Sequence, residues 1–150
     1  MADSDLIKLY SGRILELAAS IPLTERLADP GATVKKRSPL CGSTVTVDMV
    51  VTDGRVSAFG QDVKACALGQ AAAAIVGRSI LGRSGSDLIA ARDGLRAMLK
   101  EDGPVPQAPF DGFEVLQPAR DYKNRHASIL LSLDAAVDAF SQASTQTAAQ

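Results

Sequence analysis

The side chains of this chain best suited to bind a metal or sulfur are Cys41, Cys66 and His126, and there are no other cysteines or histidines. Each stands where a turn or loop meets a predicted regular element. Two thiolates and one imidazole suit a zinc or iron ion that keeps one open position. If the three boundaries meet in the fold, the sequence predicts one small metal or sulfur site.

Cys66 has the most favourable position, because it opens an alanine-rich helical pattern. A thiol at a helix N-terminus faces unpaired backbone N–H groups and the positive end of the helix dipole. Both favour the thiolate, which is the form that binds metal or attacks sulfur. The alternative is a small buried hydrophobe at a strand–helix junction, since free cysteine is often buried.

Cys41 and His126 are weaker candidates when each is taken alone. Gly42 lets the backbone bend after Cys41, and Ser43 adds a hydroxyl, although serine is a poor metal ligand. An ordinary turn before a strand explains the same residues. A single histidine such as His126 is more often a surface residue or a satisfied core residue. The spacing is not that of a compact zinc finger, so the hypothesis depends on convergence in the fold.

The elements that must position these residues form an α+β domain, with a small three-stranded antiparallel sheet packed against about four to five helices. Apolar periodicity predicts helices over 6–21, 66–81, 87–100 and 125–141, and strands over 44–51, 55–60 and 61–65. Ser4 or Asp5 is the predicted cap of the first helix, and Ser86 of the third. Thr52-Asp53-Gly54-Arg55 predicts a hairpin turn.

Two long segments lack a clear period. We expect 23–40 to be a surface loop and 101–123 to be irregular, because prolines interrupt it. Residues 1–140 are predicted to form one domain, and the polar, small-residue segment 141–150 a disordered tail.

Composition narrows the function classes. A net charge of -1 argues against a nucleic-acid binder. No apolar run is long enough for a membrane span, and the acidic start is not a signal peptide, so we expect a cytoplasmic protein with reduced thiols. The one basic cluster, Lys35-Lys36-Arg37, is either a solvated loop or a docking patch for an acidic partner.

Order and spacing together resemble the IscU/NifU-type iron–sulfur cluster assembly scaffolds. The resemblance covers nearly all of 6–140. It includes Leu9-Tyr10-Ser11, a Cys-Gly pair before a strand–Asp-Gly–strand hairpin, a cysteine opening a helix about 25 residues later, and Arg125-His126-Ala127-Ser128-Ile129-Leu130. The family's pattern is Cys-Gly-Asp, a second cysteine, and a His-Cys or Lys-Cys pair.

The resemblance implies that Cys41, Cys66 and His126 hold an iron–sulfur cluster transiently, or a zinc or iron ion, with Ser43 in the place of the family's aspartate. The third cysteine is absent, and its place falls on Ala127, or on Ser128 if the register shifts by one. A second subunit or an external ligand would then complete a two-iron, two-sulfur cluster.

The resemblance also implies partners: a cysteine desulfurase, apo iron–sulfur proteins, and a chaperone, whose recognition segment is faintly echoed in Leu116-Gln117-Pro118-Ala119-Arg120. A non-enzymatic scaffold or carrier is therefore the expected function. Two alternatives stay open: a sulfur acceptor in which Cys66 takes a persulfide, and a degenerate member that only binds proteins. No hydrolase signature or phosphate loop is present in the sequence.

Overall fold

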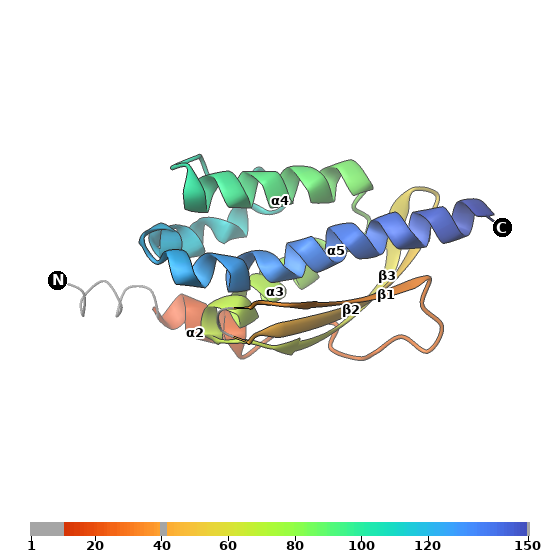
Figure 1. The fold of residues 1–150 in the computed structure, drawn as a ribbon, viewed down its shortest axis with the longest axis horizontal. Helices are drawn as coiled ribbons and strands as arrows, with labels where there is room; N and C mark the ends of the chain where they lie inside the picture. The colour runs from red at the N-terminus through yellow and green to blue at the C-terminus, as the bar shows by residue number, and fades with distance from the viewer. Residues whose placement is uncertain (1–10, 40–41, 150) are drawn as a thin grey trace.

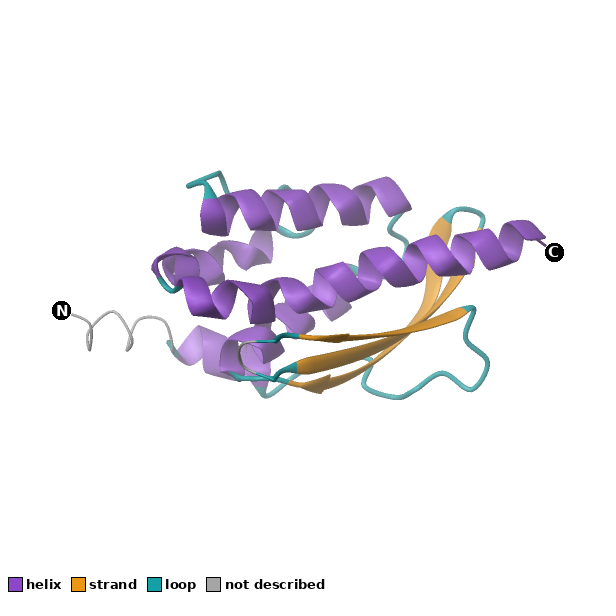
Figure 2. Cartoon of the chain, in the orientation of Figure 1, coloured by secondary structure: helices purple, strands orange, loops and turns teal. Residues whose placement is uncertain are grey.

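The computed structural model describes residues 11–39 and 42–149. It confirms the predicted α+β class, with one three-stranded antiparallel sheet and helices layered over it (Figures 1 and 2). In chain order the elements are α2 (Gly12–Ala18), β1 (Ala32–Arg37), β2 (Thr44–Thr52), β3 (Arg55–Lys64), α3 (Ala67–Ser79), α4 (Gly85–Lys100), the 3-10 helix η1 (Asp111–Asp121) and α5 (Lys123–Ala149).

The sheet has the strand order β1-β2-β3, and α5 lies across β1 and β2. Figure 1 shows α4 as the outermost layer, packed on the far side of α5 from the sheet. The predicted alternation in β2 is confirmed, because its apolar positions Val45, Val47, Met49 and Val51 are all buried. None of the described helices is long and apolar enough to cross a membrane.

The turn between β2 and β3 has the predicted conformation. Asp53 and Gly54 have φ values of 52° and 76°, and Thr52 pairs with Arg55. Positive φ at both central residues is what a two-residue hairpin requires. Together with a β-bulge between Val50 and Val51, this turn sets the register that places Thr44 opposite Lys64 at the other ends of β2 and β3.

Two strand predictions were wrong. The segments predicted as separate strands at 55–60 and 61–65 form the single strand β3, because Gly60 continues the pairing with β2 rather than ending it. The third strand is β1, inside the segment predicted as a loop. β1 is an edge strand with two buried apolar positions, Ala32 and Val34, so its apolar alternation is too short to stand out.

Helix boundaries also differ from the predictions. Ser84, not Ser86, caps α4: its side chain accepts from the Asp87 N–H while Asp87 accepts from the Ser84 N–H. These bonds lower the pKa of Asp87. Ser11 caps α2, and the predicted caps Ser4 and Asp5 lie outside the described residues.

The C-terminal segment is helical rather than irregular where it is described. α5 continues through Ala149, past the predicted start of a tail at residue 141, and Ala143 is fully buried. The reason is packing, because Ala143 lies against Gly31 beside the start of β1. Between α4 and α5, the segment predicted to be irregular contains the 3-10 helix η1, so that prediction was wrong for 111–121. Phe113 and Leu116 anchor η1 in the core.

Candidate functional site

Cys66 is the N-cap residue of α3, as its place in the sequence predicted. Its backbone is extended, and its carbonyl accepts the N–H of Gln70 at 2.9 Å. Its side chain makes no capping hydrogen bond and is half-buried. Cys66 therefore stands at the positive end of a 13-residue helix and is partly exposed to solvent.

Two serine hydroxyls connect Cys66 to the rest of the fold. The Sγ atom lies 3.5 Å from the Oγ of Ser128 on α5, and that hydroxyl donates to the Oγ of Ser43 at 3.1 Å. Both serines are buried. Ser43 directly precedes β2, and Cys66 closely follows β3, so the pairing of these strands places both at one end of the sheet. The convergence of Cys41, Cys66 and His126 on one site stays a prediction.

Gly69 permits the close approach that brings Ser128 to the thiol. A Cβ atom at position 69 would lie 2.7 Å from the Ser128 Oγ and 2.8 Å from the Ala65 Cβ. Real Cβ atoms do not approach so closely, and neither neighbour is the end of a long flexible side chain. Glycine at this position in the first turn of α3 is therefore a requirement of the site.

Two backbone hydrogen bonds join the described residues on either side of the loop before β2. The N–H of Ser38 donates to the carbonyl of Ser43 at 2.8 Å, and the N–H of Gly42 donates to the carbonyl of Ser38 at 3.0 Å. Gly42 has a φ of 69°, which agrees with the backbone bend expected of it. Cys41 lies outside the described residues, and its relation to Cys66 stays a prediction.

His126 is buried and faces different neighbours from Ser128. Its Nε2 lies 3.0 Å from the carbonyl oxygen of Ala119 and 3.1 Å from that of Arg120, at the end of η1. Carbonyls only accept, so Nε2 carries the hydrogen and Nδ1 is the nitrogen left to act as an acceptor or ligand. Side chains two residues apart on a helix do not share a face. The fold thus joins Ser43, Ser128 and Cys66 by direct contacts, and places the Nε2 edge of His126 against η1.

Ser128 is the site residue that sequence reasoning did not select. The family resemblance offered Ser128 only as one of two positions for the missing third cysteine. The available signal was a small polar residue within the apolar positions of the last helix, but a serine there is also compatible with simple packing. Within 11–39 and 42–149, no group of three or more His, Cys, Asp or Glu side chains could hold a metal ion.

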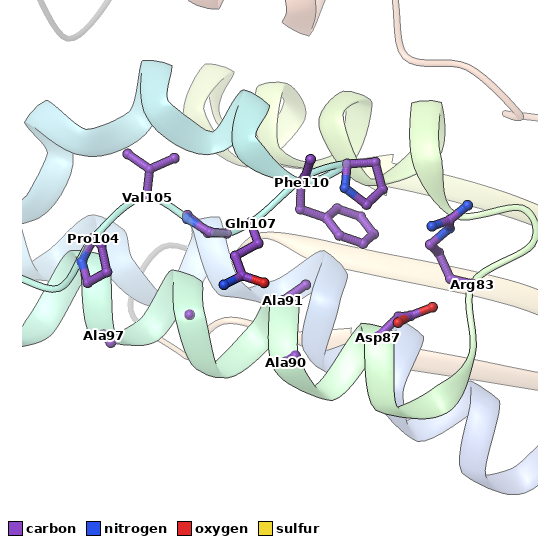
Figure 3. A pocket seen from close by; sticks show the side chains of 13 residues that line it. Arg83, Asp87, Ala90, Ala91, Ala97, Pro104, Val105, Gln107 and Phe110 are labelled. Carbon is purple, nitrogen blue, oxygen red and sulfur yellow. The ribbon is translucent and has the colours of Figure 1, made fainter.

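A separate cleft of about 430 Å³ lies between α4 and the proline-rich segment that follows it. Figure 3 shows Pro104, Val105 and Gln107 across from Ala90 and Ala97, with Arg83 and Asp87 at one end. Cys66, Ser43, Ser128 and His126 do not line this cleft. Most of the side chains that line the cleft are small or apolar, so the site at Cys66 remains the site with distinctive chemistry.

The fold and the thiol site together define an α+β domain with a half-buried cysteine at one end of a three-stranded sheet. No protein-family model matches the chain, and no curated protein matches it. Among solved structures, it is similar to a nitrogen-fixing NifU-like protein (N-terminal) from Brucella abortus, with 44% sequence identity and a TM-score of 0.91. The similarity covers 94% of this chain and 98% of that chain. The chain therefore belongs to the family of NifU-like proteins and corresponds to their N-terminal part.

Two more distant structures share the fold. One is a putative iron–sulfur cluster assembly scaffold protein for the SUF system from Fervidobacterium islandicum, with 14% identity, a TM-score of 0.75, and coverage of 85% of this chain and 93% of that chain. The other is a hypothetical protein with 16% identity, a TM-score of 0.80, and coverage of 89% and 97%. The expectation of an IscU/NifU-type family, drawn from the order of its motifs, is confirmed.

Proposed function

We propose that this protein is a scaffold or carrier for iron–sulfur cluster assembly, with the cluster or a zinc or iron ion as its cargo. The observation that carries the proposal is the half-buried thiol of Cys66 at the N-terminus of α3, in a chain that is 44% identical to a NifU-like protein. A partly open thiol can bind cargo and release it again. A cargo carrier needs that lability, whereas a structural metal site is closed.

The proposed ligands are Cys41, Cys66 and His126, with Ser43 as a neighbouring hydroxyl. The hydrogen bonds of His126 support its part, since metal-binding histidines usually donate their other ring N–H to a carbonyl or carboxylate. Its Nε2 donates to such carbonyls, which leaves Nδ1 for the cargo. Ser43 and Ser128 are weaker donors than thiolates, so we assign them hydrogen bonds to bound sulfur rather than metal ligation.

A second candidate function is favoured by the surroundings of Cys66. Within the described part of the chain, the one side-chain hydrogen bond of Cys66 is to the hydroxyl of Ser128. A thiol with this single polar neighbour can accept a sulfur atom as well as bind a metal. In this reaction the Cys66 thiolate attacks the terminal sulfur of a persulfide on a cysteine desulfurase. A new S–S bond forms on Cys66, the donor S–S bond breaks, and the desulfurase cysteine leaves as a thiolate. No external oxidant or reductant is required.

The proposal is tested by measuring iron, zinc and acid-labile sulfide in protein purified without oxygen. Cys66→Ser is expected to abolish tight binding, Cys41→Ser to weaken it strongly, and His126→Ala to weaken it less, because a water can replace one imidazole. The matched control is Ser57→Ala, an exposed hydroxyl near the hairpin turn at the other end of the sheet. Full metal stoichiometry in both cysteine variants would overturn the shared site.

The metal and sulfide content distinguishes the candidate functions. Iron with sulfide, lost in Cys66→Ser, supports the cluster scaffold, and zinc alone, lost in the same variant, supports a shared metal site. If neither is present, mass spectrometry after incubation with a desulfurase and cysteine is decisive. A gain of one sulfur atom on Cys66 supports the acceptor, whereas no gain leaves a protein-binding role for the fold.

A further inference from the structure

A groove with a strong excess of positive charge runs along α5, and neither Cys66 nor Ser128 lines it. It has a volume of about 450 Å³ and lies between the end of β1, α4 and α5, and we call it the basic groove. Its charged lining residues are Lys36, Arg37, Arg92, Arg96, Lys100, Asp134 and Asp138. Five cations and two carboxylates give a net charge of +3, whereas the whole chain has a net charge of -1. The rest of the chain therefore carries -4, so the positive charge is concentrated in this groove.

The cations of α4 form a row. Arg92, Arg96 and Lys100 are four residues apart, so they follow one face of the helix over about 12 Å. Like charges at this spacing destabilise a helix by roughly 0.2–0.5 kcal/mol per pair. Such a row is slightly unfavourable for the isolated helix, and anions that face it would offset the repulsion.

Within the described residues, the anions of the protein pair with two of the three cations of this row. Arg92 lies 3.3 Å from its neighbour Asp93, and Arg96 is paired from α5. On α5, Asp134 lies 3.8 Å from Arg96, and Asp138 pairs with Lys36 of β1. Burial raises the pKa of Asp134, and the charges of Arg96, Arg92 and Lys36 act in the opposite direction. Within the described parts of the chain, Arg37 and Lys100 have no ionic partner.

The unpaired cations lie at the end of the groove nearest the loop that leads to Cys41. Ser38, Pro39 and Ala127 line that end, together with the apolar side chain of Leu130. Ala127 directly follows His126 in the sequence. A partner held here would lie beside the segment that carries the proposed cargo ligands.

We propose that the basic groove docks an acidic segment of a partner protein. A single phosphate is much shorter than the 12 Å row, whereas an extended peptide is not. Alternate residues of an extended peptide are about 6.6 Å apart, close to the roughly 6 Å step between the cations of α4. Carboxylates on alternate residues therefore match the row, and the apolar floor at Leu130 accepts the aliphatic part of such a segment. The inference does not depend on the cargo at Cys66.

The test is fluorescence anisotropy of the apo protein with a labelled peptide of alternating glutamate and serine. The same peptide with glutamine in place of glutamate is the neutral control. We expect binding of the acidic peptide that weakens with added salt, and no binding of the neutral one. Equal binding of both peptides, or none of either, would overturn the proposal. Inorganic phosphate should compete no better than sodium chloride at equal ionic strength, and strong competition would mean a small-anion site instead.

Charge-matched variants locate the binding. Arg96→Gln with Lys100→Gln is expected to weaken peptide binding about tenfold or more, because two charge-assisted contacts are lost. Arg13→Gln with Arg78→Gln removes the same charge outside the groove and should change affinity by less than about twofold. An equal loss in both pairs would show that net charge alone is responsible and would sink the proposal. Arg37→Gln, at an exposed strand end, gives the same test if the helix variant folds poorly.

A gain of affinity is the more specific prediction. Asp138→Asn removes a carboxylate that competes for Lys36, so it should strengthen peptide binding about twofold to threefold. No gain, or a loss, would contradict the placement of the peptide in the groove. Cys66→Ser should leave peptide affinity unchanged, so this experiment and the metal analysis can fail independently.

Discussion

The hydroxyl of Ser128 lies 3.5 Å from the thiol of Cys66, although 62 residues separate them in the sequence. This contact joins α5 to the N-terminus of α3 at the end of the sheet where β2 begins. In the family pattern a third cysteine opens the last helix, and this chain has Ala127 and Ser128 there. Of these two, Ser128 is the residue in direct contact with Cys66.

The first prediction concerns Ser128→Cys. Because the two side-chain atoms already lie within 3.5 Å, a thiol at 128 should form a disulfide with Cys66 on mild oxidation. Mass spectrometry of the digested protein should identify a cross-link between Cys66 and the new thiol at 128. Ala127→Cys is the matched control and should give no cross-link between residues 66 and 127, because residue 127 faces a different side of α5. A disulfide in the control but not in Ser128→Cys would contradict the contact.

A second prediction concerns Gly69→Ala. The added methyl group would collide with Ser128 and Ala65, so α3 and α5 must separate. We expect a loss of about 1–3 kcal/mol in the free energy of unfolding, which is typical of overpacking. The thiol of Cys66 should also react faster with a colorimetric thiol reagent, because its cover moves.

Gly94→Ala is the control for that variant. A Cβ at position 94 of α4 would make ordinary contacts of 3.7 Å with Pro106. Replacing glycine inside a helix should then stabilise the protein by about 0.5–1 kcal/mol and leave thiol reactivity unchanged. If Gly69→Ala were as stable as Gly94→Ala, the two helices would not be as close as the structure has them.

The sequence predicted the elements with a strong period and missed those defined by tertiary pairing. The alternation in β2, the Asp53-Gly54 turn and the cysteine opening α3 are local patterns, and all are confirmed. β1 was missed because an edge strand with two buried positions depends on its partner β2 for its structure. The extent of α5 was missed because small residues such as Ala143 become core positions only when Gly31 lies against them.

The site could be predicted only as far as element boundaries determine it. The strand pairing brings Ser43 and Cys66 to the same end of the sheet. The rotation of α5 about its axis decides that Ser128 faces the thiol and that the Nε2 of His126 faces η1. This rotation is set by packing between distant segments, including the close approach at Gly69, and no local pattern encodes it.

A third prediction concerns Asp48, which is fully buried on the sheet. Its carboxylate accepts two hydrogen bonds from Arg26 at 2.6 and 3.0 Å, one from the Leu27 N–H and one from Thr33. The bonds from Arg26 are the main reason that the pKa of Asp48 is lowered. Asp48→Asn should lower the free energy of unfolding by about 1–3 kcal/mol, because the segment before β1 loses its anchor.

The pH dependence of stability follows from the same carboxylate. A group with a lowered pKa in the folded state stabilises the protein above its unfolded pKa, which is about 3.9 for aspartate. That stabilisation is lost as the pH falls through the lower folded pKa of Asp48. The melting temperature of the wild type should thus fall more steeply below about pH 4 than that of Asp48→Asn. Parallel curves for the two proteins would rule out this contribution.

The last prediction separates the structural role of His126 from its proposed role as a ligand. His126→Ala removes the donor for the carbonyls of Ala119 and Arg120, so we expect a loss of about 1–3 kcal/mol in the free energy of unfolding. His126→Gln has an amide N–H₂ that can donate to the same carbonyls, and it should recover part of that stability. Glutamine lacks a nitrogen that can bind metal, so it should not recover cargo binding. Chemical denaturation and metal analysis of both variants measure the two roles independently, and a glutamine variant with wild-type metal content would show that His126 only supports η1.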